Sequence, residues 1–189
     1  SAAIAIVTAP IIIAAAFEDL ELKRGIFRAI AAVARPGSVL ATNTSTLNID
    51  ELAACTSRPG DVIGLHFFSP ANVMRLLEIV RGSGTAPDVV VTAQSLAKSL
   101  SKVGVVVGNG PGFVGNRMLF PYMYECQFLV EDGATPRQVD AALTGFGMAM
   151  GLFAVDDMAG IDVAIRVGQA MGHFSEPGVR APLVQPRLH

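Results

Sequence analysis

One histidine of this sequence has the surroundings of a general acid–base group. His66 closes an apolar run of strand length, residues 62–65, and a proline turn follows shortly after it. Imidazole titrates near neutral pH, so it can accept the proton of an alcohol. Glu78 lies twelve positions later in another apolar run, and a neighbouring strand would bring its carboxylate to the ring to hold the tautomer. Taken singly, each residue is more simply a core histidine or a strand-end glutamate.

Two further polar residues follow predicted elements at positions suited to a ligand or to a helix cap. Ser45 lies in a polar run between a predicted strand at 39–42 and a predicted helix at 49–56, where its hydroxyl also fits an N-cap. Asn116 follows a glycine-rich loop at the predicted start of another helix, and it too fits a cap. From the chemistry of the side chains alone, both interpretations stay open.

These residues depend on an α/β framework in the first 108 residues. Short apolar runs alternate there with longer amphipathic ones, which is the pattern of strands and crossover helices in a mostly parallel, doubly wound sheet. Ligands of such a sheet bind at the carboxyl ends of its strands, where His66 would stand. Strands are expected at 11–16, 39–42, 62–68, 76–80 and 103–107, and helices at 19–34, 49–56 and 88–100.

A second, all-helical domain is predicted from 109 to 189. It follows a strong breaker at residues 109–112, beyond which the apolar spacing is helical. A threonine, a proline and a glutamine at 135–138 form the pattern of a capping box. Helices are expected at 116–131, from 135 onward and at 156–171, whereas the tail 176–189 contains no convincing element.

Composition excludes several classes of protein. Of the 189 residues, 51% are hydrophobic and 16% are charged, which is too apolar for a disordered chain. The net charge of −2, without a basic stripe, argues against a nucleic-acid partner. Cys55 and Cys126 have neither disulfide-framework nor zinc-site spacing, so we expect no metal and a reducing compartment. The apolar start contains Pro10 and meets Glu18 before a membrane span is complete, so we expect a cytoplasmic protein without membrane contact.

Four segments, in this order and spacing, resemble the NAD-dependent 3-hydroxyacyl-CoA dehydrogenases: residues 41–47, 64–70, 77–80 and 111–117. The stretch 125–157 is similar to the dehydrogenase part of multifunctional fatty-acid oxidation enzymes, which combine it with enoyl-CoA hydratase. The resemblance covers about residues 10–172, and it reverses the preference for a merely structural histidine. It implies oxidation of L-3-hydroxyacyl-CoA to 3-ketoacyl-CoA in β-oxidation, with NAD as cofactor and an acyl-CoA as substrate.

The resemblance also implies roles for individual residues. His66 would take the hydroxyl proton and Glu78 would orient it. Asn116 would donate to the substrate oxygen, and Ser45 would contact cofactor and substrate. The helical domain would mediate dimerisation, so we expect a homo-oligomer. The nicotinamide side of the cofactor site would consist of Ala16, Phe17, Glu18, Lys23, Ser45 and Ser69.

Glu18 and Lys23 have a second interpretation that does not depend on the resemblance. They fit an ion pair in the first turn of the helix predicted at 19–34, where a glutamate before a lysine stabilises the helix electrostatically.

Three features depart from the family pattern. No G-x-G-x-x-G motif follows a strand anywhere in the chain, so the loop that cradles the pyrophosphate is absent from these 189 residues. Ala14 and Leu152 stand where relatives usually have a glutamate and a proline. We therefore expect residues 1–108 to be the C-terminal half of a Rossmann-type domain, part of a longer chain and inactive alone. Two alternatives stay open: a catalytically silent assembly module, and a short-chain 3-hydroxybutyryl-CoA dehydrogenase.

Overall fold

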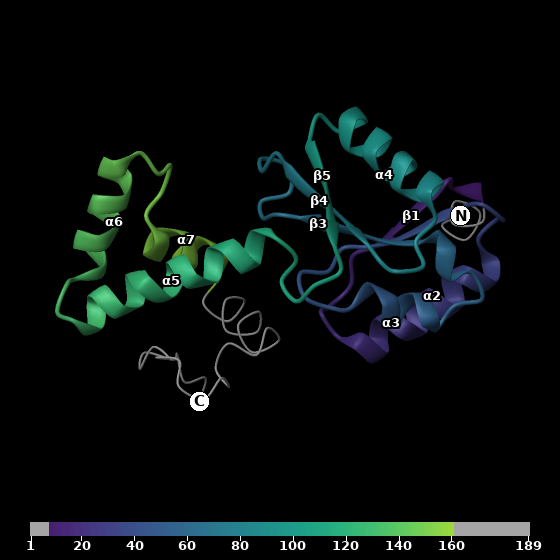
Figure 1. The fold of residues 1–189 in the computed structure, drawn as a ribbon, viewed down its shortest axis with the longest axis horizontal. Coiled ribbons are helices and arrows are strands. Elements are labelled where there is room, and N and C mark those ends of the chain that lie inside the picture. Colours follow the sequence, from purple (N-terminus) through teal and green to yellow (C-terminus); the bar gives the residue numbers. More distant parts are fainter. Residues whose placement is uncertain (1–7, 161–189) are drawn as a thin grey trace. The chain divides into compact units, whose positions relative to one another are not determined.

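The computed structural model describes residues 8–160 of the chain (Figure 1). The chain divides into two compact units, Ser1–Val114 and Gly115–His189. In the part that is described, the first unit is a sheet covered by helices and the second unit consists of helices (Figure 1). The α/β class predicted for the first part of the chain, followed by helices, is confirmed.

The first unit contains a sheet of five strands in the order β1-β2-β3-β4-β5. Strands β1, β2 and β3 are parallel, β4 is antiparallel to β3, and β5 is parallel to β4. The mostly parallel sheet is thus as predicted, with one reversal. The reversal follows from the connection at 68–75, which is too short to cross back over the sheet. The strands are β1 (Ile11–Ala14), β2 (Val39–Thr42), β3 (Val62–Phe67), β4 (Leu76–Arg81) and β5 (Val103–Gly108).

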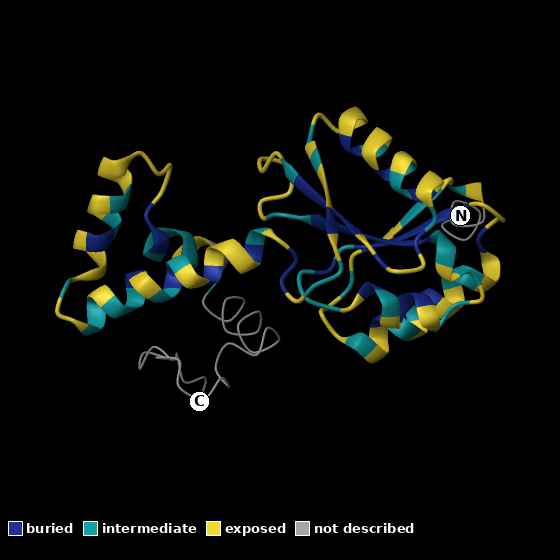
Figure 2. Cartoon of the chain, viewed as in Figure 1, coloured by how far each residue is buried: buried dark blue, intermediate teal, exposed yellow. Residues whose placement is uncertain are grey.

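Helices cover both faces of the sheet, as a doubly wound fold requires (Figure 1). On one face, Phe27 and Ile49 pack into a core layer with residues of β2, β3 and β4. On the other face, Ala93 and Ala97 pack against the opposite side of the same strands. Figure 2 shows the central strands buried between these layers. The elements between the strands are α2 (Leu20–Val33), α3 (Ile49–Ala54), the 3-10 turn η1 (Pro59–Asp61) and α4 (Pro87–Ser99).

The second unit contains α5 (Gly115–Glu131), α6 (Pro136–Phe146) and α7 (Leu152–Ala159) among its described residues. The predicted capping box is present: the Thr135 hydroxyl accepts from the Gln138 N–H, and the Gln138 side chain accepts from the Thr135 N–H. A small apolar core, which includes Met123 and Leu152, joins the three helices.

Helix α7 begins four residues before the start predicted at 156. Its N-cap residue, Gly151, has no side chain, and the Asp140 carboxylate on α6 accepts hydrogen bonds from the N–H groups of Phe153 and Ala154 instead (3.0 Å each). A cap supplied by another helix leaves no local sequence signal, which is why the predicted start was wrong. The predicted continuation to 171 and the predicted tail at 176–189 lie outside the described residues.

None of the helices within residues 8–160 is long and apolar enough to cross a membrane. The same residues contain no cluster of three or more histidine, cysteine, aspartate or glutamate side chains that could hold a metal ion.

Candidate active site

His66 and Glu78 stand opposite each other on the antiparallel strands β3 and β4. Residues paired in this way point to the same face of a sheet, so the two side chains meet. His66 Nδ1 lies 2.8 Å from Glu78 Oε2, and the two side chains are only 5% and 2% exposed. A carboxylate can only accept a hydrogen bond, so Nδ1 donates and Nε2 is the nitrogen that can accept a proton. The pair has the geometry of a general base held by a carboxylate.

The surroundings of this pair are apolar and hold it in place. The imidazole packs against the rings of Phe68 and Phe113, with ring centroids 4.5 Å and 5.6 Å away. The second carboxylate oxygen, Glu78 Oε1, accepts a hydrogen bond from the Val114 N–H at 3.0 Å. Glu78 is therefore held from two sides, and the ring that it orients is shielded from water.

Ser45 lies in the connection between β2 and α3, which we call the Ser45 loop (residues 43–47). The Ser45 N–H donates to Glu18 Oε1 at 2.8 Å. The N-cap of α3 is Asn48, whose side chain accepts from the Asp50 N–H at 2.9 Å, so Ser45 does not cap that helix. Of the two interpretations left open by the sequence, the structural one is thereby removed, and the contact of Ser45 with cofactor and substrate stays a prediction.

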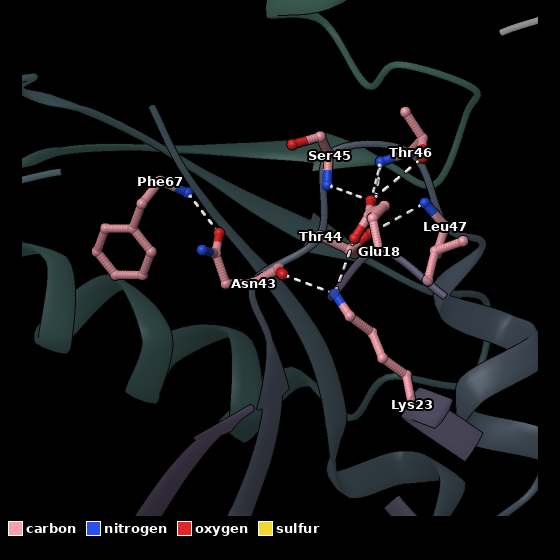
Figure 3. Close-up of polar contacts among 8 residues, drawn as sticks. All are labelled: Glu18, Lys23, Asn43, Thr44, Ser45, Thr46, Leu47 and Phe67. Atoms are coloured by element: carbon pink, nitrogen blue, oxygen red, sulfur yellow. Dashed lines mark hydrogen bonds and ion pairs between the residues drawn. The ribbon is translucent and has the colours of Figure 1, made fainter. Parts of the chain in front are cut away.

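Glu18 and Lys23 form the ion pair that the sequence suggested, beside the Ser45 loop (Figure 3). Lys23 is fully buried, and its ammonium donates to Glu18 Oε2 and to the Asn43 carbonyl, each at 2.8 Å. Burial by itself raises the pKa of Glu18, but the hydrogen bonds from Lys23 and Thr44 outweigh this effect and the pKa lies below its usual value. Glu18 is therefore a carboxylate at neutral pH.

The remaining residues predicted for the nicotinamide side lie in connections after strands. Ala16 and Phe17 follow β1, and the Phe17 side chain is 82% exposed. Ser69 is exposed in the loop after β3. Because β1, β2 and β3 are parallel, their carboxyl ends lie at the same end of the sheet, and the connections that follow them leave from there. The connection after β2 contains Ser45. The first unit thus brings the predicted cofactor residues and His66 to the carboxyl ends of these parallel strands.

Asn116 belongs to the second unit, where it is a buried residue in the first turn of α5. Its predicted role toward the substrate oxygen stays a prediction. The two substituted positions among the departures from the family pattern, Ala14 and Leu152, both fill apolar cores. Ala14 is buried at the end of β1, and Leu152 is buried among the helices of the second unit.

Sequence reasoning assigned no role to Asn43, which connects two strand ends. Its side-chain oxygen accepts a hydrogen bond from the Phe67 N–H, directly after His66, at 3.2 Å. The ladder between β2 and β3 ends earlier, at the pair Thr42 and Gly64. The available signal was an asparagine at the first position beyond a strand. There a side-chain oxygen can accept the hydrogen bond that the backbone of the strand no longer provides.

A doubly wound sheet with a buried base at its carboxyl edge is typical of dinucleotide-dependent dehydrogenases. Two family models match the chain: the NAD binding domain of 3-hydroxyacyl-CoA dehydrogenase over residues 2–110, and the C-terminal domain of 3-hydroxyacyl-CoA dehydrogenase over residues 112–188. The chain therefore belongs to the 3-hydroxyacyl-CoA dehydrogenase family, and the resemblance seen in the sequence is confirmed.

Individual relatives agree with this membership. The chain is 51% identical over 177 residues to a peroxisomal bifunctional enzyme of Danio rerio, a match that covers 94% of this chain and 24% of the relative. It is 48% identical over 162 residues to the peroxisomal bifunctional enzyme of Homo sapiens, covering 86% of this chain and 22% of the relative. The chain thus spans about a quarter of the length of these relatives.

A solved structure of similar fold is 3-hydroxybutyryl-CoA dehydrogenase from Escherichia coli K12. The two chains superpose with a TM-score of 0.85 at 38% sequence identity, over 92% of this chain and 38% of that one. This likeness agrees with the Rossmann-type sheet described above.

Proposed function

We propose that this chain provides dehydrogenase chemistry in fatty-acid β-oxidation, the oxidation of L-3-hydroxyacyl-CoA to 3-ketoacyl-CoA with NAD. The observation that carries the proposal is the buried His66–Glu78 pair, with Nδ1 and Oε2 2.8 Å apart, at the edge of the sheet where such folds bind their ligands. The names of the relatives, which are peroxisomal bifunctional enzymes, support the same pathway and a multifunctional parent.

The residues of the chain fit the nicotinamide half of an NAD site. The hydroxyls of Ser45 and Ser69 and the exposed ring of Phe17 belong to one edge of the sheet, and hydroxyls and an aromatic face suit a ribose and a nicotinamide. No glycine-rich pyrophosphate loop occurs within the 189 residues. NAD held along this edge would supply the acceptor for the hydride from C3 of the substrate.

The side chains of this chain manage the proton of the reaction. His66 Nε2 takes the proton from the C3 hydroxyl while the C3–H bond breaks, so that the alcohol becomes a ketone. Glu78 keeps the proton on Nδ1 and stabilises the imidazolium that forms. Asn116 donates to the substrate oxygen, and Ser45 contacts cofactor and substrate. One positioned base and the carboxylate that orients it handle the proton of this oxidation.

A short-chain 3-hydroxybutyryl-CoA dehydrogenase is the second candidate function. The E. coli structure named above as a 3-hydroxybutyryl-CoA dehydrogenase favours it, although the relatives from Danio rerio and Homo sapiens are more similar in sequence. Rates measured across CoA esters of different chain length separate the two candidates. A preference confined to the four-carbon ester would establish the short-chain enzyme.

Compartment and assembly belong to the same proposal. The sequence favoured the cytoplasm, whereas the names of the relatives favour a peroxisome for the protein that contains this chain.

Homo-oligomerisation through the helical unit is supported by its exposed apolar side chains. These include Met118, Leu129, Phe146 and Met158.

His66→Ala in the complete polypeptide that contains this sequence tests the function. The variant should lose roughly 10² to 10⁴ in kcat, because a positioned acid–base group contributes that much. NADH binding should stay unchanged, since the base is not needed for it. An unchanged rate would end the assignment of His66, and a wild-type protein without any dehydrogenase activity would establish the silent assembly module instead.

A further inference from the structure

We propose that Glu18 is a positioning residue that holds the Ser45 loop in its working conformation and, through Lys23 and Asn43, the end of β3 beside His66. The inference rests on the proposed function, because it concerns the same site. It differs from the direct cofactor contact that the resemblance implies for Glu18. The contacts of Glu18 within the protein carry it.

One carboxylate oxygen, Glu18 Oε1, receives four hydrogen bonds from the Ser45 loop (Figure 3). The backbone N–H groups of Ser45 and Thr46 donate at 2.8 Å and 3.0 Å. The hydroxyls of Thr44 and Thr46 donate at 2.5 Å and 3.1 Å. Hydrogen bonds to a charged acceptor are stronger than those between neutral groups. The loop therefore folds around this carboxylate.

No strand could hold these residues in place of Glu18. The pairing of β2 with β1 and with β3 reaches Thr42 and goes no further. The Thr46 N–H has a second acceptor in Thr44 Oγ1, but at 3.4 Å that contact is longer than the 3.0 Å contact with Glu18 Oε1. Within the loop itself, Thr44 Oγ1 accepts from the Leu47 N–H at 2.9 Å, so the hydroxyl that donates to Glu18 also closes the turn.

The other carboxylate oxygen connects Glu18 to the strand that carries His66. Glu18 Oε2 pairs with the buried ammonium of Lys23, which also donates to the Asn43 carbonyl. The Asn43 side chain in turn accepts from the Phe67 N–H, one peptide unit beyond His66. A buried ammonium needs a charged partner, because an unpaired buried charge is strongly destabilising. Loss of the Glu18 charge therefore disturbs both the loop and the end of β3.

Kinetics of the complete polypeptide separate positioning from cofactor contact. The test variant is Glu18→Gln, and its matched control is Glu21→Gln, an exposed glutamate on α2 that pairs with Arg24. With substrate and NAD both saturating, Glu18→Gln should lose about 10- to 100-fold in kcat, because a displacement of about 1 Å costs on that order. Glu21→Gln should stay within about twofold, as an exposed ion pair contributes little. A raised KM for NAD with an unchanged kcat would overturn the proposal, because a cofactor contact alone gives that result.

A double-mutant cycle with Ser45→Ala tests whether Glu18 acts through Ser45. If it does, the double variant Glu18→Gln with Ser45→Ala should have a kcat close to that of the slower single variant. Losses that multiply would show that the two residues act independently, and they would contradict the proposed route through the loop.

Hydrogen exchange tests the positioning role without any need for activity. Amides of the peptide that contains residues 43–48 should exchange about tenfold faster in Glu18→Gln than in wild type or in Glu21→Gln. Should the unpaired Lys23 ammonium prevent Glu18→Gln from folding, the double variant Glu18→Gln with Lys23→Gln removes both charges and serves instead. Unchanged exchange in the folded variant would overturn the proposal. A wild-type protein that lacks dehydrogenase activity would refute the proposed function alone, and the exchange experiment would still decide the role of Glu18.

Discussion

Substitution of Glu78 by glutamine probes the candidate active site most directly. His66 Nδ1 lies 2.8 Å from the carboxylate and the Val114 N–H lies 3.0 Å from it, and both groups donate to it. Glutamine has nearly the same shape but only one acceptor oxygen. If that oxygen faces Val114, the amide N–H₂ faces Nδ1 and forces the ring proton onto Nε2, which can then no longer accept the substrate proton. If it faces Nδ1, two N–H donors confront each other at Val114.

The expected loss follows from the charge-assisted hydrogen bond between Glu78 and His66. A hydrogen bond to a charged group contributes about 1.5–3 kcal/mol, and each 1.36 kcal/mol in the barrier is tenfold in rate. Glu78→Gln should therefore reduce kcat by roughly 10- to 150-fold. The side chains of the pair are nearly inaccessible, so solvent does not replace the lost charge.

Steady-state NADH formation by the complete polypeptide, with both substrates saturating, measures the effect. Glu51→Gln is the matched control, because Glu51 is half exposed and pairs with Arg24 on the surface. Its kcat should equal that of wild type. If Glu78→Gln retained more than half of the wild-type kcat with an unchanged melting temperature, the carboxylate would not orient His66 and the reasoning would be refuted.

Two further predictions concern the second unit. Burial raises the pKa of Asp156 to about 6, and the neighbouring Asp157 and Asp140 carboxylates add to this effect. The folded state therefore binds this proton more tightly than the unfolded state, so stability should fall as the pH rises from about 4 to about 6, and Asp156→Asn should melt higher than wild type above pH 6 but not below pH 4. Gly151→Ala should cost about 1–3 kcal/mol in urea unfolding, because its Cβ would meet the Asp140 carboxylate. Gly145→Ala, with no atom near its added Cβ in α6, is the control and should be neutral or stabilising.

The sheet of the first unit could be predicted because a strand that is buried on both faces leaves a clear pattern of apolar residues in the sequence. Its strands are nearly continuous apolar runs, and the breakers between them are glycines and prolines. The ends of the elements were less predictable. Strand β1 stops at Ala14 although the apolar run continues to Ala16, because no partner strand extends beyond Thr42. A strand ends where its pairing with a neighbouring strand ends, and the sequence of one segment alone does not show that pairing.

The site was predictable to the extent that side chains carry its chemistry. Residue type and spacing suggested the His66–Glu78 pair, the family resemblance made it the preferred interpretation, and the structure brings the two side chains together. The contacts of Glu18 could not be foreseen, because two of its four donors to Oε1 are backbone N–H groups, which every residue but proline possesses. The link from Asn43 to β3 was hidden for the same reason. Side-chain chemistry can be inferred from sequence, whereas the backbone groups that position it require the fold.

The orientation of Glu78 toward His66 is a consequence of how β4 is buried. Leu77 and Ile79 lie in the core layer beneath α4, so the residue between them, Glu78, must face the opposite side, where His66 stands across from it. A shift of one residue would move both side chains out of that layer and put the carboxylate into it. Lys102 reinforces this register, since its ammonium donates to the carbonyls of residues 71 and 74 in the loop before β4 at 2.6 Å and 2.7 Å. The apolar pattern of β4 thus determines the face that Glu78 points to, and the pairing with β3 places it across from His66.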